Sequence, residues 1–178
     1  SGIPESVFQI LHLDHASTSK IISDHRINHV LFTGSVSGGR EVKKAIGTRF
    51  IGAGLELGGK DPSYVRSDCN FEHAIENLVD GSYFNSGQSC CGIERIYVDE
   101  SIFANFVDAF KAQTEKYTLD NPLNDSTNLG PVVKLSAANN IRNQVAKAIN
   151  EGAKNIIDGS KFKKDNSENC YVSPSALI

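Results

Sequence analysis

Apolar positions recur along the chain with two spacings, which predict two kinds of element. Short continuous or alternating apolar runs predict strands at residues 7–13, 29–33, 50–57, 63–65, 93–98 and 155–157. Apolar residues three and four apart predict helices at residues 40–46, 71–84 and 135–150, and another helix from about residue 100. A short helix is expected around residues 21–22, and an extended segment from residue 170. Strands that alternate with helices predict an α/β fold.

Glycine ends the apolar run at residues 29–33 and opens a turn before the next helix. The centre of the run, Val30, Leu31 and Phe32, is continuously apolar, as expected of a parallel strand buried on both faces, and the sequence GSVSGG follows the run at residues 34–39. A strand, a glycine-rich turn and a helix form the plan of a phosphate-binding corner. The spacing differs from the GxGxxG pattern of dinucleotide sites, so a simple tight turn remains the alternative.

The charge balance argues against nucleic acid or an anionic membrane as a partner. The 178 residues carry a net charge of -3 and have a pI of about 5.9, so they provide no basic surface. No stretch approaches the roughly 18 consecutive apolar residues of a membrane-spanning helix, and the start lacks the pattern of a secretion signal. The chain contains no Met, so we also expect that it has been processed or is a piece of a longer protein.

The cysteines and histidines do not form a metal-binding pattern. The four cysteines contain no CxxC pair and no regular spacing, which argues against a disulfide framework or a zinc site. The histidines lie in the N-terminal part of the chain without the spacing of metal ligands. We therefore expect no metal site, and we expect reduced thiols in a cytoplasmic protein.

Cys90 and Glu56 are the candidate reactive residues. Cys90 follows a Gly-Gln turn among polar neighbours, which is typical of an exposed thiol, while burial as a small apolar residue is the alternative. The local sequence favours neither of these two interpretations over the other. Glu56 lies between Leu55 and Leu57, where burial of a carboxylate requires a partner or a chemical task. The alternative for Glu56 is a strand residue that points to solvent.

The other three cysteines lack a comparable polar setting. Core packing is the better expectation for Cys69, Cys91 and Cys170.

Three motifs together carry a resemblance to a known family. They are FTGS at residues 32–35, LELGGKDP at residues 55–62 and FNSGQSC at residues 84–90. In this order and spacing they resemble the NAD(P)-dependent aldehyde dehydrogenase superfamily, and the resemblance covers essentially the whole chain. It implies the end of a Rossmann-like cofactor domain joined to an α/β catalytic domain with a largely parallel sheet. The implied boundary assigns residues 1–57 to the NAD(P)-binding domain and residues 58–178 to a truncated catalytic domain.

The resemblance also implies the roles of single residues. Cys90 would be the nucleophile that attacks an aldehyde, and Glu56 would be the general base that activates water to hydrolyse the thioester. The residues implied to contact NAD or NADP are Gly34, Ser35 and Gly39 at the diphosphate and Leu57 and Gly58 beside the nicotinamide.

Several parts of the family's site lie outside this sequence. The oxyanion Asn, both ribose-binding residues and the oligomerisation strands of the family have no counterpart here, although the resemblance implies a homo-oligomer for the full-length protein. HLDH at residues 12–15 replaces a glycine-containing turn and leaves the adenine side of the site open. Neither the aldehyde nor the choice between NAD and NADP follows from these residues.

Two other functions remain open at this point. The chain could be a catalytically incomplete remnant that serves as a binding or structural partner. It could also transfer acyl groups or hydrolyse esters through Cys90 and Glu56 without a cofactor, although the phosphate-type turn would then have no use.

Overall fold

The computed structural model describes residues 2–178, which form two compact units that divide between Gly58 and Gly59. Each unit is an α/β structure built on a pair of parallel strands. The expected α/β class with parallel pairing is therefore confirmed. Among the described residues, no helix is both long and apolar enough to span a membrane.

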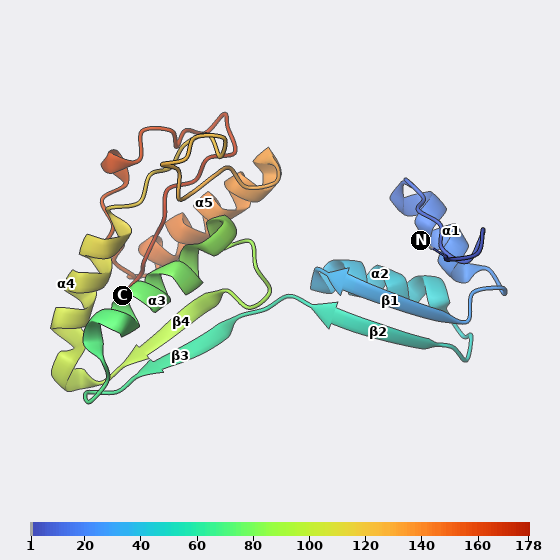
Figure 1. Cartoon of the computed structure of the whole chain (residues 1–178), viewed down its shortest axis with the longest axis horizontal. Helices are drawn as coiled ribbons and strands as arrows, with labels where there is room; N and C mark the ends of the chain where they lie inside the picture. The colour runs from blue at the N-terminus through green and yellow to red at the C-terminus, as the bar shows by residue number, and fades with distance from the viewer. Residues whose placement is uncertain (1) are drawn as a thin grey trace. The chain divides into compact units, whose positions relative to one another are not determined.

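The first unit contains a β–α–β crossover preceded by a short helix. Its elements are α1 (His15–Ser23), β1 (His29–Gly34), α2 (Val36–Ile46) and β2 (Gly52–Leu57). β1 and β2 pair in parallel from His29 opposite Gly52 to Gly34 opposite Leu57. α2 runs along this strand pair (Figure 1), and it buries Val42 and Ile46. The crossover brings the carboxyl ends of both strands to the same edge.

α2 begins four residues earlier than the sequence predicts. The side chain of Ser35 caps the helix by accepting a hydrogen bond from Gly38 N. The two glycines in the first turn disfavour a helix by propensity, but the packing requires them. A β-carbon on Gly38 would stand 2.6 Å from the Phe32 ring, and one on Gly39 would stand 2.6 Å from Leu57 Cδ1. Contact with the strands therefore outweighs the intrinsic preference.

The predicted strand at residues 7–13 is wrong. These residues form no strand, and they have no ladder partner within the part of the chain that the structure describes. Apolar side chains along the segment remain exposed, among them Val7, Phe8 and Leu11. An apolar run becomes a strand only where a neighbouring strand accepts its hydrogen bonds.

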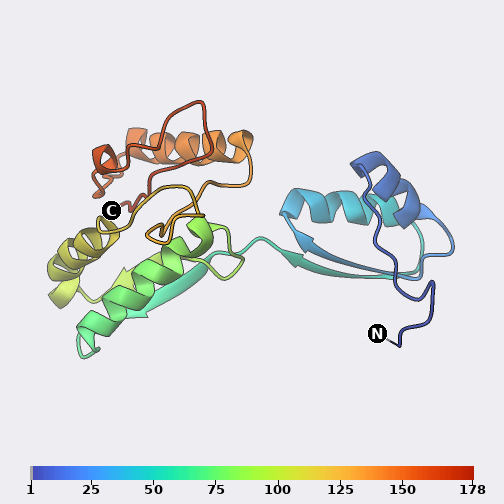
Figure 2. The same ribbon diagram turned by 45° about the horizontal axis from the view of Figure 1, so that its top comes forward.

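The second unit packs helices on its strand pair. Its elements are β3 (Asp61–Val65), α3 (Phe71–Tyr83), β4 (Ile93–Val98), α4 (Phe103–Thr114) and α5 (Leu135–Asn150), with short 3₁₀ turns at Phe84–Gly87, Glu100–Ile102 and Gly159–Lys161. β3 and β4 are parallel, and α3 lies along them in both views (Figure 1, Figure 2). The main core cluster joins α3 to α4 through Ile75, Leu78, Val79, Phe106 and Phe110. The ends of β4 and α5 coincide with the predicted ranges.

The strand predicted at residues 155–157 is reduced to a single bridge between Asn155 and Leu177. Ile156 N donates to Ala176 O at 2.9 Å, but Ala176 N donates to the side chain of Asn155 at 3.3 Å instead of to Ile156 O. The Asn155 side chain therefore takes the place of the backbone acceptor that would extend the ladder.

Candidate functional site

Cys90 and Cys91 are the two central residues of a tight turn that precedes β4. Gly92 N donates to Ser89 O at 3.2 Å and closes the turn. Both thiols are exposed, so the open question about Cys90 resolves toward an accessible thiol. The expected core packing of Cys91 is wrong, because the central residues of this turn face away from the core.

The other two cysteines are half-buried. Cys69 packs against the core cluster of α3 and α4, as the sequence predicts. Cys170 is also partly covered.

The segment that leads into the thiol turn has an unusual backbone. After α3 ends at Tyr83, Asn85, Ser86 and Gly87 all adopt positive φ angles of 50°, 57° and 74°. Positive φ is uncommon for residues other than glycine and costs about 1–3 kcal/mol where the side chain is retained. Such strain persists only where surrounding contacts enforce it, and it tends to occur at functional sites.

Two side chains anchor this segment to the loop that precedes α5, far away in the sequence. Ser86 Oγ donates to Gly130 O at 2.9 Å. Gln88 Oε1 accepts from Val133 N at 2.8 Å, while Gln88 Nε2 donates to Asn85 O at 3.1 Å. These hydrogen bonds fix the turn on both sides of Gly87. Sequence reasoning missed Ser86 and Gln88, although polar side chains around a glycine before a thiol were a signal for them.

Gly59 passes directly beside the thiol turn at the start of the second unit. A β-carbon on Gly59 would stand 1.7 Å from the carbonyl oxygen of Cys90. Gly92, the last residue of the turn, also contacts β3, because Asp61 N donates to Gly92 O at 3.3 Å. The chain that enters β3 therefore forms one wall of the Cys90 turn.

Tyr83 connects the base of the thiol segment to the last residues of the chain. Its hydroxyl donates to Ser175 O at 3.1 Å, and its ring packs against Phe110 and Tyr117. Burial raises the pKa of the Tyr83 hydroxyl well above its usual range. The side chain therefore stays neutral and acts as a fixed donor at the end of α3.

Glu56 lies in β2 of the first unit, whereas Cys90 belongs to the second unit. Phe32 and Leu57 contact α2, so alternation along the strands directs Thr33 and Glu56 to the opposite face. Thr33 and Glu56 are neighbours in register, and both are exposed. Within this chain, Glu56 is therefore the solvent-facing strand residue that the sequence offered as the alternative to a buried carboxylate.

The five residues expected to contact a cofactor gather at one end of the β1–β2 pair. Gly34 is opposite Leu57 in register, and Gly58 N donates to Gly34 O at 3.0 Å. Ser35 caps α2 at this edge, and Gly39 packs on Leu57. In α/β proteins, ligands bind beyond the carboxyl ends of parallel strands, and a helix N-terminus favours phosphate. The small side chains at this edge leave the backbone accessible, so the residues fit the diphosphate of a dinucleotide.

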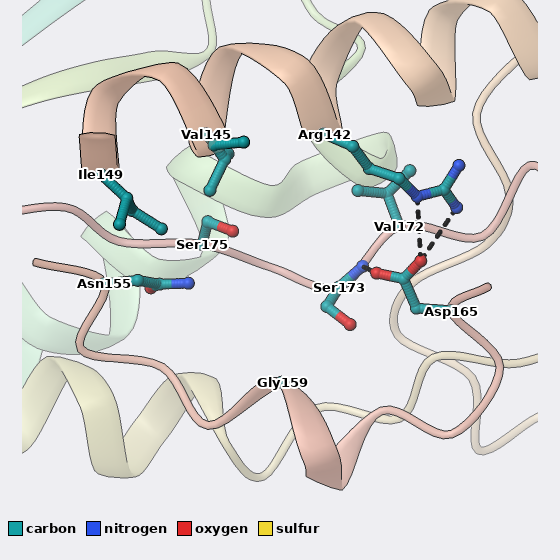
Figure 3. A pocket seen from close by; sticks show the side chains of 10 residues that line it. Arg142, Val145, Ile149, Asn155, Gly159, Asp165, Val172, Ser173 and Ser175 are labelled. Atoms are coloured by element: carbon teal, nitrogen blue, oxygen red, sulfur yellow. Dashed lines mark hydrogen bonds and ion pairs between the residues drawn. The ribbon is translucent and has the colours of Figure 1, made fainter. Parts of the chain in front are cut away.

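Two hollows occur elsewhere in the second unit. One of about 500 Å³ reaches Ser86 and Gly87 from the side of α4 and α5. The other, of about 410 Å³, lies beside α5, where Arg142 pairs with Asp165 at 2.9 Å and Asp165 accepts from Ser173 N at 2.7 Å (Figure 3). The second hollow contains none of the expected site residues. Within residues 2–178, no group of three or more potential ligands could hold a metal ion.

Comparison with known proteins gives a consistent result. The sequence profile of the aldehyde dehydrogenase family matches residues 1–178. The succinate semialdehyde dehydrogenase Sad of Escherichia coli is 33% identical over 99% of this chain and 38% of its own length. The glyceraldehyde-3-phosphate dehydrogenase GapN of Methanocaldococcus jannaschii, solved with NADP, superimposes with a TM-score of 0.81 at 32% identity over 90% of this chain and 33% of its own.

A second solved structure agrees. The betaine aldehyde dehydrogenase of Staphylococcus aureus, solved with NAD+, superimposes with a TM-score of 0.80 at 30% identity over 88% of this chain and 32% of its own. The chain spans 30% to 38% of the length of three curated relatives that it matches. With the family profile matched from the first residue to the last, the chain belongs to the aldehyde dehydrogenase family.

Proposed function

We propose that the protein that carries this chain oxidises an aldehyde to a carboxylic acid with NAD(P)+, and that Cys90 is its nucleophile. The observation that carries the proposal is the exposed Cys90 turn, which Gly59, Ser86 and Gln88 hold in one conformation. A nucleophile on a rigid, accessible turn can approach a carbonyl carbon without reorganising. Family membership supports the same chemistry.

The reaction begins when the Cys90 thiolate adds to the aldehyde carbonyl and forms a thiohemiacetal. Backbone N–H groups of the turn stabilise the oxyanion. Loss of a hydride from the former carbonyl carbon leaves a thioester on Cys90. Glu56 then takes a proton from water, which attacks the thioester and releases the acid and the thiolate. The exposed position of Glu56 on its strand leaves the carboxylate free to contact water.

NAD or NADP would supply the hydride acceptor for this reaction. Gly34, Ser35 and Gly39 would hold its diphosphate, with Leu57 and Gly58 beside the nicotinamide. The gathering of these residues at one strand edge supports the assignment. Relatives solved with NADP and with NAD+ are consistent with either cofactor.

The remaining expectations follow from the same function. Residues 1–57 would complete the NAD(P)-binding domain and residues 58–178 would begin the catalytic domain. The full-length protein would act on a small aldehyde as a cytoplasmic homo-oligomer.

The nucleophile is tested by comparing Cys90→Ala with Cys69→Ala in the full-length protein. We expect Cys90→Ala to abolish aldehyde-dependent NAD(P)H formation, whereas Cys69→Ala retains it, because Cys69 lies in the core of the second unit. Iodoacetamide should label Cys90 before Cys69. Undiminished turnover in Cys90→Ala would refute the assignment of the nucleophile.

The base is tested separately with Glu56→Gln. Acylation does not need the carboxylate, so this variant should produce one burst of NAD(P)H and then stop with an acylated Cys90. Glu41→Gln is the matched control, because Glu41 is exposed on α2 and pairs with the exposed Lys44. Multiple turnovers at the normal rate in Glu56→Gln would exclude Glu56 as the base.

A further inference from the structure

The proposed oxidation uses one thiol, yet the turn presents two. Cys90 and Cys91 are consecutive, both are exposed, and they occupy the two central positions of the turn closed by Gly92 N and Ser89 O. Cys91 Sγ lies 3.2 Å from Ser89 Oγ, which keeps this sulfur above the turn rather than in the core. Neither the packing nor the proposed reaction gives Cys91 a role.

We propose that Cys91 is a resolving thiol, which converts peroxide-oxidised Cys90 into a reversible disulfide between the two neighbours. The proposal rests on the proposed function in one respect, namely that Cys90 is the reactive thiolate. Accessible nucleophilic thiolates are the ones that peroxides oxidise, and a nearby second thiol decides whether the product is reversible.

Hydrogen peroxide is the oxidant in the first step. The Cys90 thiolate attacks one peroxide oxygen, the O–O bond breaks, and the products are Cys90 sulfenic acid and hydroxide. The Cys91 thiolate then attacks the Cys90 sulfur, the S–O bond breaks, and hydroxide leaves as the S–S bond forms. Each peroxide is reduced to two equivalents of water or hydroxide while two thiols become one disulfide.

The geometry of neighbouring residues makes this disulfide labile. Consecutive α-carbons lie about 3.8 Å apart across a trans peptide, whereas ordinary disulfides span about 4.4–6.8 Å. The linkage therefore strains the turn, and strained, exposed disulfides are the readily reduced ones. A thiol reductant should regenerate both cysteines, so the disulfide would protect Cys90 from irreversible oxidation to sulfinic acid.

The test treats the full-length protein with hydrogen peroxide, blocks free thiols with N-ethylmaleimide and digests it with trypsin. One tryptic peptide, residues 67–95, contains Cys69, Cys90 and Cys91. We expect this peptide to keep one label, on Cys69, and to lose two hydrogen atoms in mass. A second digestion after Glu72 and Glu76 separates Cys69 from the pair and identifies the disulfide.

Cys91→Ser is the decisive variant, and Cys69→Ser is its matched control in the same peptide. After peroxide and then dithiothreitol, wild type and Cys69→Ser should regain their activity, whereas Cys91→Ser should stay inactive with sulfinic acid on Cys90. A peptide that carries sulfinic acid in wild type, or equal recovery in Cys91→Ser, would overturn the proposal.

The mass readout separates this proposal from the proposed function. If Cys90→Ala abolishes turnover but no disulfide forms in wild type, only the resolving role of Cys91 fails. If the disulfide forms in a protein whose turnover survives Cys90→Ala, only the assignment of Cys90 as catalytic nucleophile fails.

Discussion

The α-carbon of Gly59 lies against the peptide group of Cys90. A β-carbon at position 59 would stand 1.7 Å from the Cys90 carbonyl oxygen, 2.6 Å from the carbonyl carbon and 2.9 Å from the α-carbon. All three atoms belong to the backbone, so no rotation of a flexible side chain can relieve the overlap. The entry to β3 and the thiol turn can therefore occupy these positions only if residue 59 is glycine.

We expect Gly59→Ala to displace the Cys90 turn and to destabilise the second unit by about 2 kcal/mol, in the range of overpacked sites. All five tyrosines lie between residues 59 and 178, so tyrosine fluorescence during urea unfolding reports on this unit alone. The rate at which iodoacetamide alkylates Cys90 should also differ between this variant and wild type. Gly159→Ala is the control, because a β-carbon there meets nothing within 4 Å. Equal unfolding midpoints for both variants would contradict the steric argument.

Periodicity predicted the elements whose packing agrees with their local preference. The ranges of β4 and α5 follow from the sequence because most apolar positions of each lie on one partly buried face. The start of α2 does not follow from the sequence in this way. Gly38 and Gly39 are poor helix formers, but the contacts with Phe32 and Leu57 require them. The strand at residues 7–13 failed for a different reason, because a strand depends on a partner that local sequence does not reveal.

The features of the candidate site also divide into those set by neighbouring residues in the sequence and those set by distant contacts. The exposure of Cys90 is consistent with its polar neighbours, which are local. The anchors of its turn are not local, because Ser86 bonds to a residue 44 positions away and Gln88 to one 45 positions away. The exposure of Glu56 agrees with its alternation with Leu55 and Leu57, since strand neighbours point to opposite faces.

Two substitutions at Ser86 separate the effect of its side-chain hydrogen bond from the effect of its positive φ angle. Ser86→Ala keeps the positive φ of 57° and loses the hydrogen bond to Gly130 O, so the second unit should lose about 1 kcal/mol of stability. Ser86→Gly loses the same hydrogen bond but adopts the left-handed backbone without strain. We therefore expect Ser86→Gly to be more stable than Ser86→Ala by about 1 kcal/mol in urea unfolding. The reverse order would mean that the backbone of residue 86 is unstrained.

Arg142 joins α5 to the loop that precedes the last segment of the chain. Its guanidinium donates to Asp165 Oδ1 through Nε at 3.1 Å and Nη2 at 2.9 Å, and also to Tyr171 O at 2.7 Å. Lysine cannot reproduce this fork, so Arg142→Lys should cost the second unit about 1–3 kcal/mol in urea unfolding.

Arg66→Lys provides the matched comparison for Arg142→Lys. Arg66 donates to Asp68 in the same unit through the same two nitrogens, Nε to Oδ1 and Nη2 to Oδ2. Both of these side chains are about 70% exposed, against 22% and 23% for Arg142 and Asp165. Exposed ion pairs contribute about 0–1 kcal/mol. If Arg66→Lys were as destabilising as Arg142→Lys, the carbonyl contacts of Arg142 would contribute nothing.

Glu115 should make the second unit sensitive to acid. Its side chain is only 10% exposed, forms an ion pair with Lys161 and accepts from Asp158 N at 3.1 Å. These contacts, first that with Lys161 and then that with the Asp158 backbone, lower the pKa of the Glu115 carboxyl below its usual value. The unfolded chain then binds a proton more readily than the folded chain. The stabilisation is therefore complete above the unfolded pKa of about 4.5 and is lost as the pH falls through the folded pKa.

Glu115→Gln removes this titration while keeping the shape of the side chain. We expect the variant to be less stable than wild type at neutral pH, with the difference in stability narrowing as the pH falls from about 5 through the lowered pKa of folded Glu115. Urea midpoints from tyrosine fluorescence across this range measure the narrowing directly. Glu151→Gln is the control, because Glu151 is 66% exposed and pairs with Lys147 only across 3.8 Å on the surface of α5. A constant difference between wild type and Glu115→Gln at every pH would show that the contacts of Glu115 stabilise the fold independently of its charge.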